Sequence, residues 1–169
     1  MAAKPNVKPF DKESTFSEEG LDARALITRT DKRGIITFAS KAYREMTKYS
    51  RKELVGKPHS IVRHPLMPEA AFKEMWDTIE RGEHWEGMVK NLRKDGKYYW
   101  VVVQIDPIDE NGNIIYSTPE DIGGYVAVRR EPTKEEIKEA DKLYRKMRKA
   151  ELLAKQNLKD WEKEVLKEL

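Results

Sequence analysis

Short hydrophobic runs separated by polar turns characterise the chain from about residue 25 onward. The segments at residues 25–30 (ALITRT) and 35–38 (IITF) are rich in β-branched residues, and residues 31–34 (DKRG) lie between them. Glycine in such a turn tolerates the positive φ that a tight reversal requires. The pattern therefore predicts a β-hairpin at the start of the domain.

Helical signals follow the hairpin. Ser40 is a candidate N-cap for a helix that ends near residue 48, and Ser50 with Glu53 forms the capping box of a second, shorter helix. Apolar residues spaced three and four apart predict a longer helix at residues 68–81, which Gly82 would end.

Three strand-like segments come next, at residues 85–92, 97–108 and 123–130. Residues 94–96 (KDG) between the first two are a strong hairpin-turn signal. Two strands, a helical crossover and three further strands make an α+β fold in which the helices cover one face of a single antiparallel sheet. A pocket between sheet and crossover is the natural ligand site.

The C-terminal part changes to a helical period. Thr133 with Glu136 forms a capping box, and no Pro or Gly interrupts the sequence after it. A heptad pattern kept over roughly 30 residues predicts one long helix with a coiled-coil or helical-hairpin partner, and we expect a homodimer through it. The alternative is a helix that folds back on its own domain. The apolar heptad positions are Ile137, Ala140, Tyr144, Met147, Ala154, Leu158, Trp161 and Val165.

Composition and charge narrow the function classes. Charged residues make up 37% of the chain, but basic and acidic groups are interleaved and the net charge is only +3. This distribution lacks the one-sided basic field of a nucleic-acid-binding protein.

The absence of cysteine excludes disulfides, thiolate catalysis and cysteine-ligated metals. With no signal-peptide pattern at the start and no apolar run long enough to cross a bilayer, we expect a cytoplasmic chain without a membrane span.

Catalytic motifs are not apparent in the sequence. It shows no nucleophile–base combination, no glycine-rich phosphate loop and no histidine pair at metal-site spacing, so we expect a protein that is not an enzyme. His59 and His84 are predicted to be surface groups.

Three segments together carry a resemblance to a known family. They are residues 53–65 (ELVGKPHSIVRHP), 67–76 (MPEAAFKEMW) and 82–91 (GEHWEGMVKN). Their combination resembles the PAS domains of bacterial aerotaxis receptors, over about residues 23–131. The resemblance implies a PAS fold, a five-stranded antiparallel sheet with short flanking helices. It divides the chain into an N-terminal arm (1–22), a PAS sensor domain (23–131) and a C-terminal signalling helix (132–169).

The resemblance also implies a cofactor, FAD, and redox or oxygen state as the input. Family flavin-site positions fall on Arg63, His64, Trp85 and Asn91. The arginine fork suits phosphate oxygens, and the asparagine amide offers both a donor and an acceptor to a flavin ring edge. Two positions depart from the family pattern: Ser40 replaces an asparagine, and Leu66 replaces an aspartate.

The expected function is therefore an FAD-binding PAS sensor that passes redox or oxygen state through its C-terminal helix to a downstream signalling domain or protein. One alternative is a PAS module without cofactor that serves dimerisation or protein interaction. Another is a haem-binding PAS sensor, in which His64 would be the iron ligand.

Overall fold

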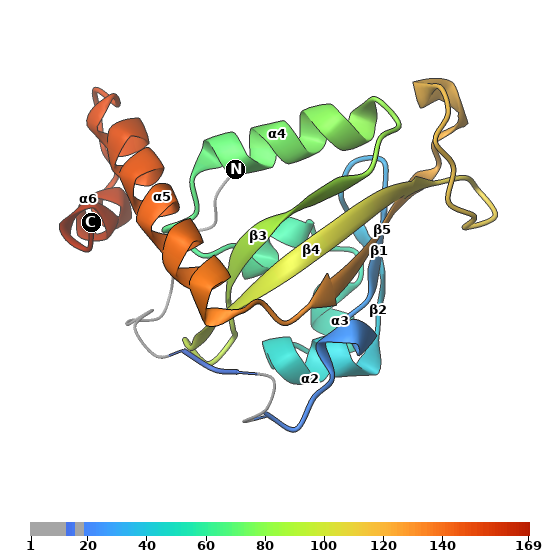
Figure 1. The fold of residues 1–169 in the computed structure, drawn as a ribbon, viewed down its shortest axis with the longest axis horizontal. Helices are drawn as coiled ribbons and strands as arrows, with labels where there is room; N and C mark the ends of the chain where they lie inside the picture. The colour runs from blue at the N-terminus through green and yellow to red at the C-terminus, as the bar shows by residue number, and fades with distance from the viewer. Residues whose placement is uncertain (1–12, 16–18) are drawn as a thin grey trace.

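A five-stranded antiparallel sheet forms the centre of the fold (Figure 1). The computed structural model describes residues 13–15 and 19–169, and its strand order is β2-β1-β5-β4-β3. The N-terminal hairpin therefore pairs with the last strand, which lies at the centre of the sheet, and β2 and β3 form its edges. The strands are β1 (Thr28–Asp31), β2 (Ile36–Ala39), β3 (Trp85–Leu92), β4 (Tyr98–Ile108) and β5 (Gly124–Arg130).

Short helices connect β2 to β3, as the sequence predicts. Ser40 caps the first of them by accepting a hydrogen bond from the Tyr43 amide, and both hydrogen bonds of the Ser50–Glu53 capping box are present. The connecting elements are α2 (Lys41–Thr47), α3 (Arg51–Leu54), η2 (His59–Val62) and α4 (Glu69–Glu80). Two further short helices lie outside this crossover: η1 (Ala23–Ala25) precedes β1, and η3 (Pro119–Asp121) lies between β4 and β5.

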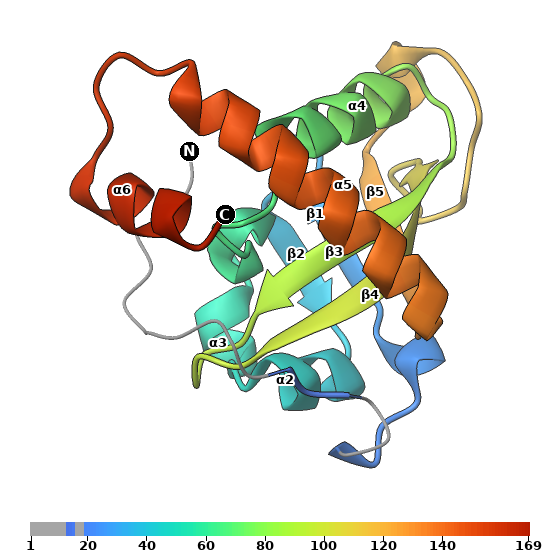
Figure 2. The same cartoon turned by 60° about the vertical axis from the view of Figure 1, so that its left-hand side comes forward.

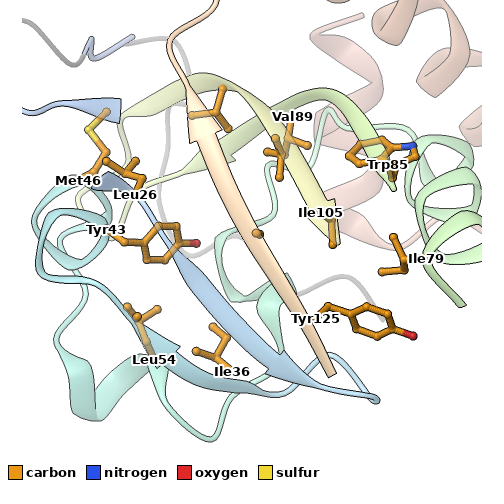
Figure 3. Close-up of a cluster of buried hydrophobic side chains, with 14 of the residues drawn as sticks. Leu26, Ile36, Tyr43, Met46, Leu54, Ile79, Trp85, Val89, Ile105 and Tyr125 are labelled. Carbon is orange, nitrogen blue, oxygen red and sulfur yellow. The ribbon is translucent and has the colours of Figure 1, made fainter. Parts of the chain in front are cut away.

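The hydrophobic core lies between these helices and the inner face of the sheet (Figure 3). Tyr43 and Met46 of α2 are fully buried in it, and Ile79 of α4 packs on the same cluster. Along β4, the inner-face residues Tyr99, Val101 and Val103 alternate with Trp100 and Val102 of the outer face. The outer-face pair is buried too, because Tyr144 of the C-terminal helix packs near Trp100, so the expectation that helices cover only one face of the sheet is corrected. The α+β class and the PAS-type sheet are thus confirmed.

The C-terminal part differs from the prediction. Helix α5 (Lys134–Leu153) confirms a long C-terminal helix capped by Thr133 and Glu136, but the prediction that it continues through Val165 is wrong. The helix ends at Leu153, and α6 (Asp160–Lys167) folds back beside it (Figure 2).

Burial of apolar surface explains this reversal. Leu152 of α5 and Val165 of α6 are fully buried against Leu66, in a second small core that the loop between the helices makes possible. On α5, Ala140 is buried and Tyr144 packs on the main core. Much of the heptad seam therefore faces the chain's own domain.

The predicted N-terminal arm falls largely outside the described residues, since 1–12 and 16–18 are not among them. Ser14 of the described part donates its backbone N–H to the Tyr98 carbonyl, 2.8 Å away. Within the described part of the chain, no helix has both the length and the apolar character needed to cross a bilayer. The three-part domain division stays a prediction.

Candidate functional site

A cavity of about 310 Å³ lies between the inner face of the sheet and the crossover elements η2 and α4. This volume falls at the lower end of the range typical of small-molecule sites. Aromatic and aliphatic side chains dominate the wall, three arginines reach it, and it contains no aspartate or glutamate. The polar lining residues are Thr28, Thr30, Arg33, His59, Ser60, Arg63, Asn91 and Arg129, and the aromatic ones are Phe72, Trp76 and Tyr125.

Arg63 reaches the cavity from the end of η2. Its guanidinium lies over the Phe72 ring, with Cζ 3.9 Å from the ring centroid. The Arg63 Nε is buried and has no hydrogen-bond partner among the described residues. Burial lowers the pKa of Arg63, but a guanidinium stays charged in proteins. Arg63 therefore offers an unused donor and a positive charge to a ligand.

Asn91 is brought next to Arg63 by the backbone. An isolated antiparallel bridge joins residues 63 and 91, so the loop after η2 lies against β3. Asn91 is only 4% exposed, lines the cavity, and its Nδ2 donates to the Tyr99 hydroxyl at 3.4 Å. Two of the four predicted site residues thus share one wall.

Arg129 of β5 is a second cation on the cavity wall, and it is buried. Its Nη1 donates to the Leu26 and Ala127 carbonyls, and its Nη2 contacts Thr28 Oγ1 and His59 Nε2, each at 3.1 Å. All four partners are neutral, and no carboxylate pairs with this guanidinium among the described residues. A buried charge without a counter-ion is unusual and favours an anionic ligand.

The prediction that His59 is a surface group is wrong, because it lines the cavity. Burial, and then the charge of Arg129, lower the pKa of His59 to about 3. The ring is therefore neutral, and since Arg129 can only donate, Nε2 is the acceptor and Nδ1 carries the proton. The sequence could have indicated that Arg129 faces the cavity, since side chains alternate along a strand and Arg129 falls on the same face of β5 as Tyr125 and Ala127.

A pH dependence of stability follows from the neutral His59. Unfolding restores its usual pKa of 6.5, so the unfolded chain binds a proton that the folded chain does not. Stability is then full above pH 6.5 and falls as the pH drops toward 3. We expect the free energy of unfolding to decrease by about 1 kcal/mol between pH 7.5 and 5.5, a window above the pH at which the carboxylates begin to bind protons.

Urea unfolding at several pH values measures this slope. His59→Gln should remove this slope. A slope that persists in His59→Gln would contradict the assignment of the pH dependence to a neutral His59.

The other two predicted residues are not among those that line the cavity. His64 is fully buried, and its Nδ1 accepts the Leu66 backbone N–H at 3.0 Å. Trp85 covers Gly87, and its Nε1 donates to Glu74 at 3.2 Å. Both hold the structure around the cavity, and a direct cofactor contact by either stays a prediction.

The two departures from the family pattern have local roles. Ser40 Oγ caps α2 and donates to the Ala25 carbonyl at 2.6 Å, which ties α2 to the segment before β1. Leu66 belongs to the small core beneath α5 and α6. Neither residue lines the cavity.

Among the described residues, no three metal-ligating side chains gather at one point.

Comparison with known proteins shows which family has this architecture. Residues 36–118 match the model of the PAS fold family. The chain is 40% identical over 124 residues to the aerotaxis receptor of Escherichia coli, a match that covers 73% of this chain and 23% of that protein. This chain contains a PAS domain of the aerotaxis-receptor family.

More distant relatives agree with this assignment. The PAS chain is 31% identical over 86 residues to the nitrogen fixation regulatory protein of Klebsiella pneumoniae, covering 51% of this chain and 17% of that protein. It thus spans less than a quarter of the length of these relatives.

Solved structures show the same fold. The dark structure of the Aureochrome1 LOV photoreceptor superposes with a TM-score of 0.55 at 20% identity, over 86% of this chain and 99% of that one. A LOV domain studied with a flavin analogue gives 0.56 at 23% identity, over 72% and 87%.

Proposed function

We propose that this PAS domain binds FAD in the cavity and reports redox or oxygen state as a non-enzymatic sensor module. The observation that carries the proposal is an aromatic-walled cavity with two guanidiniums, of the half-buried Arg63 and the buried Arg129, and no acidic lining residue. FAD combines an aromatic ring system with two negatively charged phosphates, so both features suit it. The similarity to the aerotaxis receptor and to LOV domains supports a flavin.

Each lining residue then has a defined task. Arg63 would hold anionic oxygens of the ligand, and Asn91 would face the ring edge. Bound flavin supplies reversible electron uptake, which turns its N5 from a hydrogen-bond acceptor into a donor. The Asn91 amide can hydrogen-bond to N5 in both redox states because it has a donor and an acceptor, but the amide group must rotate to exchange them. Asn91 is hydrogen-bonded to Tyr99, so such a rotation also affects β4.

A route to the C-terminal helix starts on the same strand. The Tyr144 hydroxyl of α5 donates to the Met88 carbonyl of β3 at 2.9 Å, and its ring packs near Trp100 of β4. A shift of β3 at Asn91 therefore reaches α5 directly, in addition to the path through β5 into its N-terminus. The output would be a downstream signalling domain or protein in the cytoplasm.

The proposal includes a homodimer through the C-terminal helix. Leu143 and Leu153 of α5 are 54% and 63% exposed, so they, rather than the inward-facing heptad positions, are the apolar groups available to a second copy. Analytical ultracentrifugation of the protein and of a variant with both leucines changed to Gln tests this contact.

The deciding experiment is an absorption spectrum of purified protein before and after addition of FAD. The two visible bands of bound oxidised flavin, with FAD released on denaturation, would support the sensor. A Soret band would instead point to haem at His64. Colourless protein that takes up no FAD would leave an interaction module.

Asn91→Ala should lower FAD affinity about fivefold, the value of one lost hydrogen bond of about 1 kcal/mol. Fluorescence titration measures the affinity, and circular dichroism confirms folding. Asn111→Ala, in an exposed loop, is the matched control and should bind as the wild type does. Equal affinity in the folded Asn91→Ala protein would place the ring edge elsewhere.

A further inference from the structure

The start of helix α4 is capped by a residue from the far end of the chain. Its own N-cap position is Pro68, which supplies no side-chain cap. Instead, Glu151 of α5 accepts the Glu69 amide on Oε1 and the Ala70 amide on Oε2, each at 2.9 Å. A bidentate carboxylate at a helix N-terminus satisfies free amides and opposes the helix dipole.

Arg148 makes the next contact between α5 and the same segment. It is only 2% exposed, and its Nε donates to the Pro65 carbonyl at 3.0 Å. Its Nη1 also lies 3.3 Å from Glu151 Oε1, which fixes the orientation of the capping carboxylate. Two neighbouring side chains of α5 thus hold the backbone on both sides of residue 66.

Leu66 itself fills the space between these polar contacts. It is 6% exposed and packs with Leu152 and Val165, which are fully buried. An aspartate here, as the family pattern has, would place a carboxylate in this apolar cluster. The apolar side chain of Leu66 therefore suits the apolar surface of the helical hairpin that covers it, whereas a carboxylate would be buried there without a partner.

The segment held in this way leads directly into the cavity wall. Arg63 lies two residues before Pro65, and its side chain rests on Phe72 of α4. Since the Arg63 Nε has no hydrogen-bond partner among the described residues, its direction depends on its backbone and on α4. The α5–α6 hairpin holds both of these supports.

We propose that the C-terminal hairpin is part of the ligand site, with Arg148 and Glu151 as positioning residues that hold Arg63 toward an anionic ligand. The identity of that ligand as FAD rests on the function proposed above. Because coupling between two sites is reciprocal, a ligand held by Arg63 must in turn strengthen the docking of the hairpin by the same factor.

Replacement of the capping carboxylate tests the proposal. Glu151→Gln should weaken FAD binding at least about fivefold, within the usual range of coupling between sites. Glu139→Gln, on an exposed position of the same helix, is the matched control and should bind normally.

A second substitution separates positioning from simple helix capping. Pro68→Ser in the Glu151→Gln background gives α4 a local cap, since residue 68 has the extended backbone of an N-cap (φ −71°, ψ 141°). It should restore thermal stability but leave FAD affinity low. Recovery of affinity together with stability would overturn the positioning role.

Hydrogen exchange of the protein without added ligand keeps the test independent of FAD. In Glu151→Gln, exchange should rise across residues 63–70 and also in β3 around Asn91, which pairs with Arg63. Faster exchange confined to residues 69–70 would overturn the proposal. Wild-type protein that fails to bind FAD would remove the proposed function alone, and this exchange pattern would still decide the role of the hairpin.

Discussion

Arg93→Met is expected to lower the free energy of unfolding by about 2–3 kcal/mol at neutral pH, somewhat less than the roughly 3–5 kcal/mol for breaking a fully buried ion pair, because Asp95 is 42% exposed. The Arg93 side chain is 2% exposed in the turn between β3 and β4. It forms ion pairs with Glu19 and Asp95, and its Nη1 donates to Ser14 at 2.8 Å. The substitution leaves the carboxylates short of their partner and releases the described part of the N-terminal arm.

Acid should reduce this difference. Arg93, then Lys48, lower the pKa of Glu19 from 4.5 to about 2. A lowered carboxyl pKa stabilises the fold above pH 4.5, and the contribution is lost as the pH falls toward 2. Urea unfolding at pH 7 and near pH 3 measures it, with the solvent-exposed Arg24→Met as the control that should leave stability unchanged. An equal loss of stability in both variants would contradict the prediction that the ion pairs of Arg93 contribute more than an exposed ion pair does.

Local signals in the sequence predicted the helix starts well. Ser50 and Thr133 both form the capping boxes that their spacing to Glu53 and Glu136 predicts. Such motifs involve residues three apart, so they need no knowledge of the rest of the fold. The β-hairpins followed from equally local turn chemistry.

The reversal after Leu153 depends on distant partners. Val165 is buried because Leu66, almost a hundred positions earlier, offers it an apolar surface. A heptad pattern states which residues are apolar on one face, but not which surface they will cover. The same ambiguity left the dimer and the folded-back helix as alternatives.

Only some of the cavity-lining residues could be expected from the sequence, because which residues gather around a cavity also depends on contacts between distant segments. Motif resemblance identified Arg63 and Asn91, which the structure places on one wall of the cavity. It did not identify Arg129, because a lone arginine in a strand is usually a solvent-facing residue. Only its inward position in the alternation of β5 marked it as unusual.

Arg129→Met is expected to weaken FAD binding about tenfold or more, equivalent to about 1.4 kcal/mol. Arg129 is 4% exposed and has only neutral hydrogen-bond partners, so its charge is free to act on a ligand in the cavity. Stability should change by less than about 1 kcal/mol, since loss of hydrogen bonds and relief of a buried charge oppose each other. Fluorescence titration and urea unfolding measure the two quantities.

Arg33 provides a control within the same cavity wall. Its side chain is 79% exposed and forms an ion pair with Asp31 at 2.9 Å, so its charge is already compensated and screened. Arg33→Met should therefore change FAD affinity far less than Arg129→Met, and Arg129→Lys should recover part of the loss because it keeps the charge. Riboflavin, which has no phosphates, should lose less affinity than FAD in Arg129→Met. Equal binding of FAD by wild type and folded Arg129→Met would mean that the buried charge does not select the ligand, and that the aromatic wall alone would have to account for it.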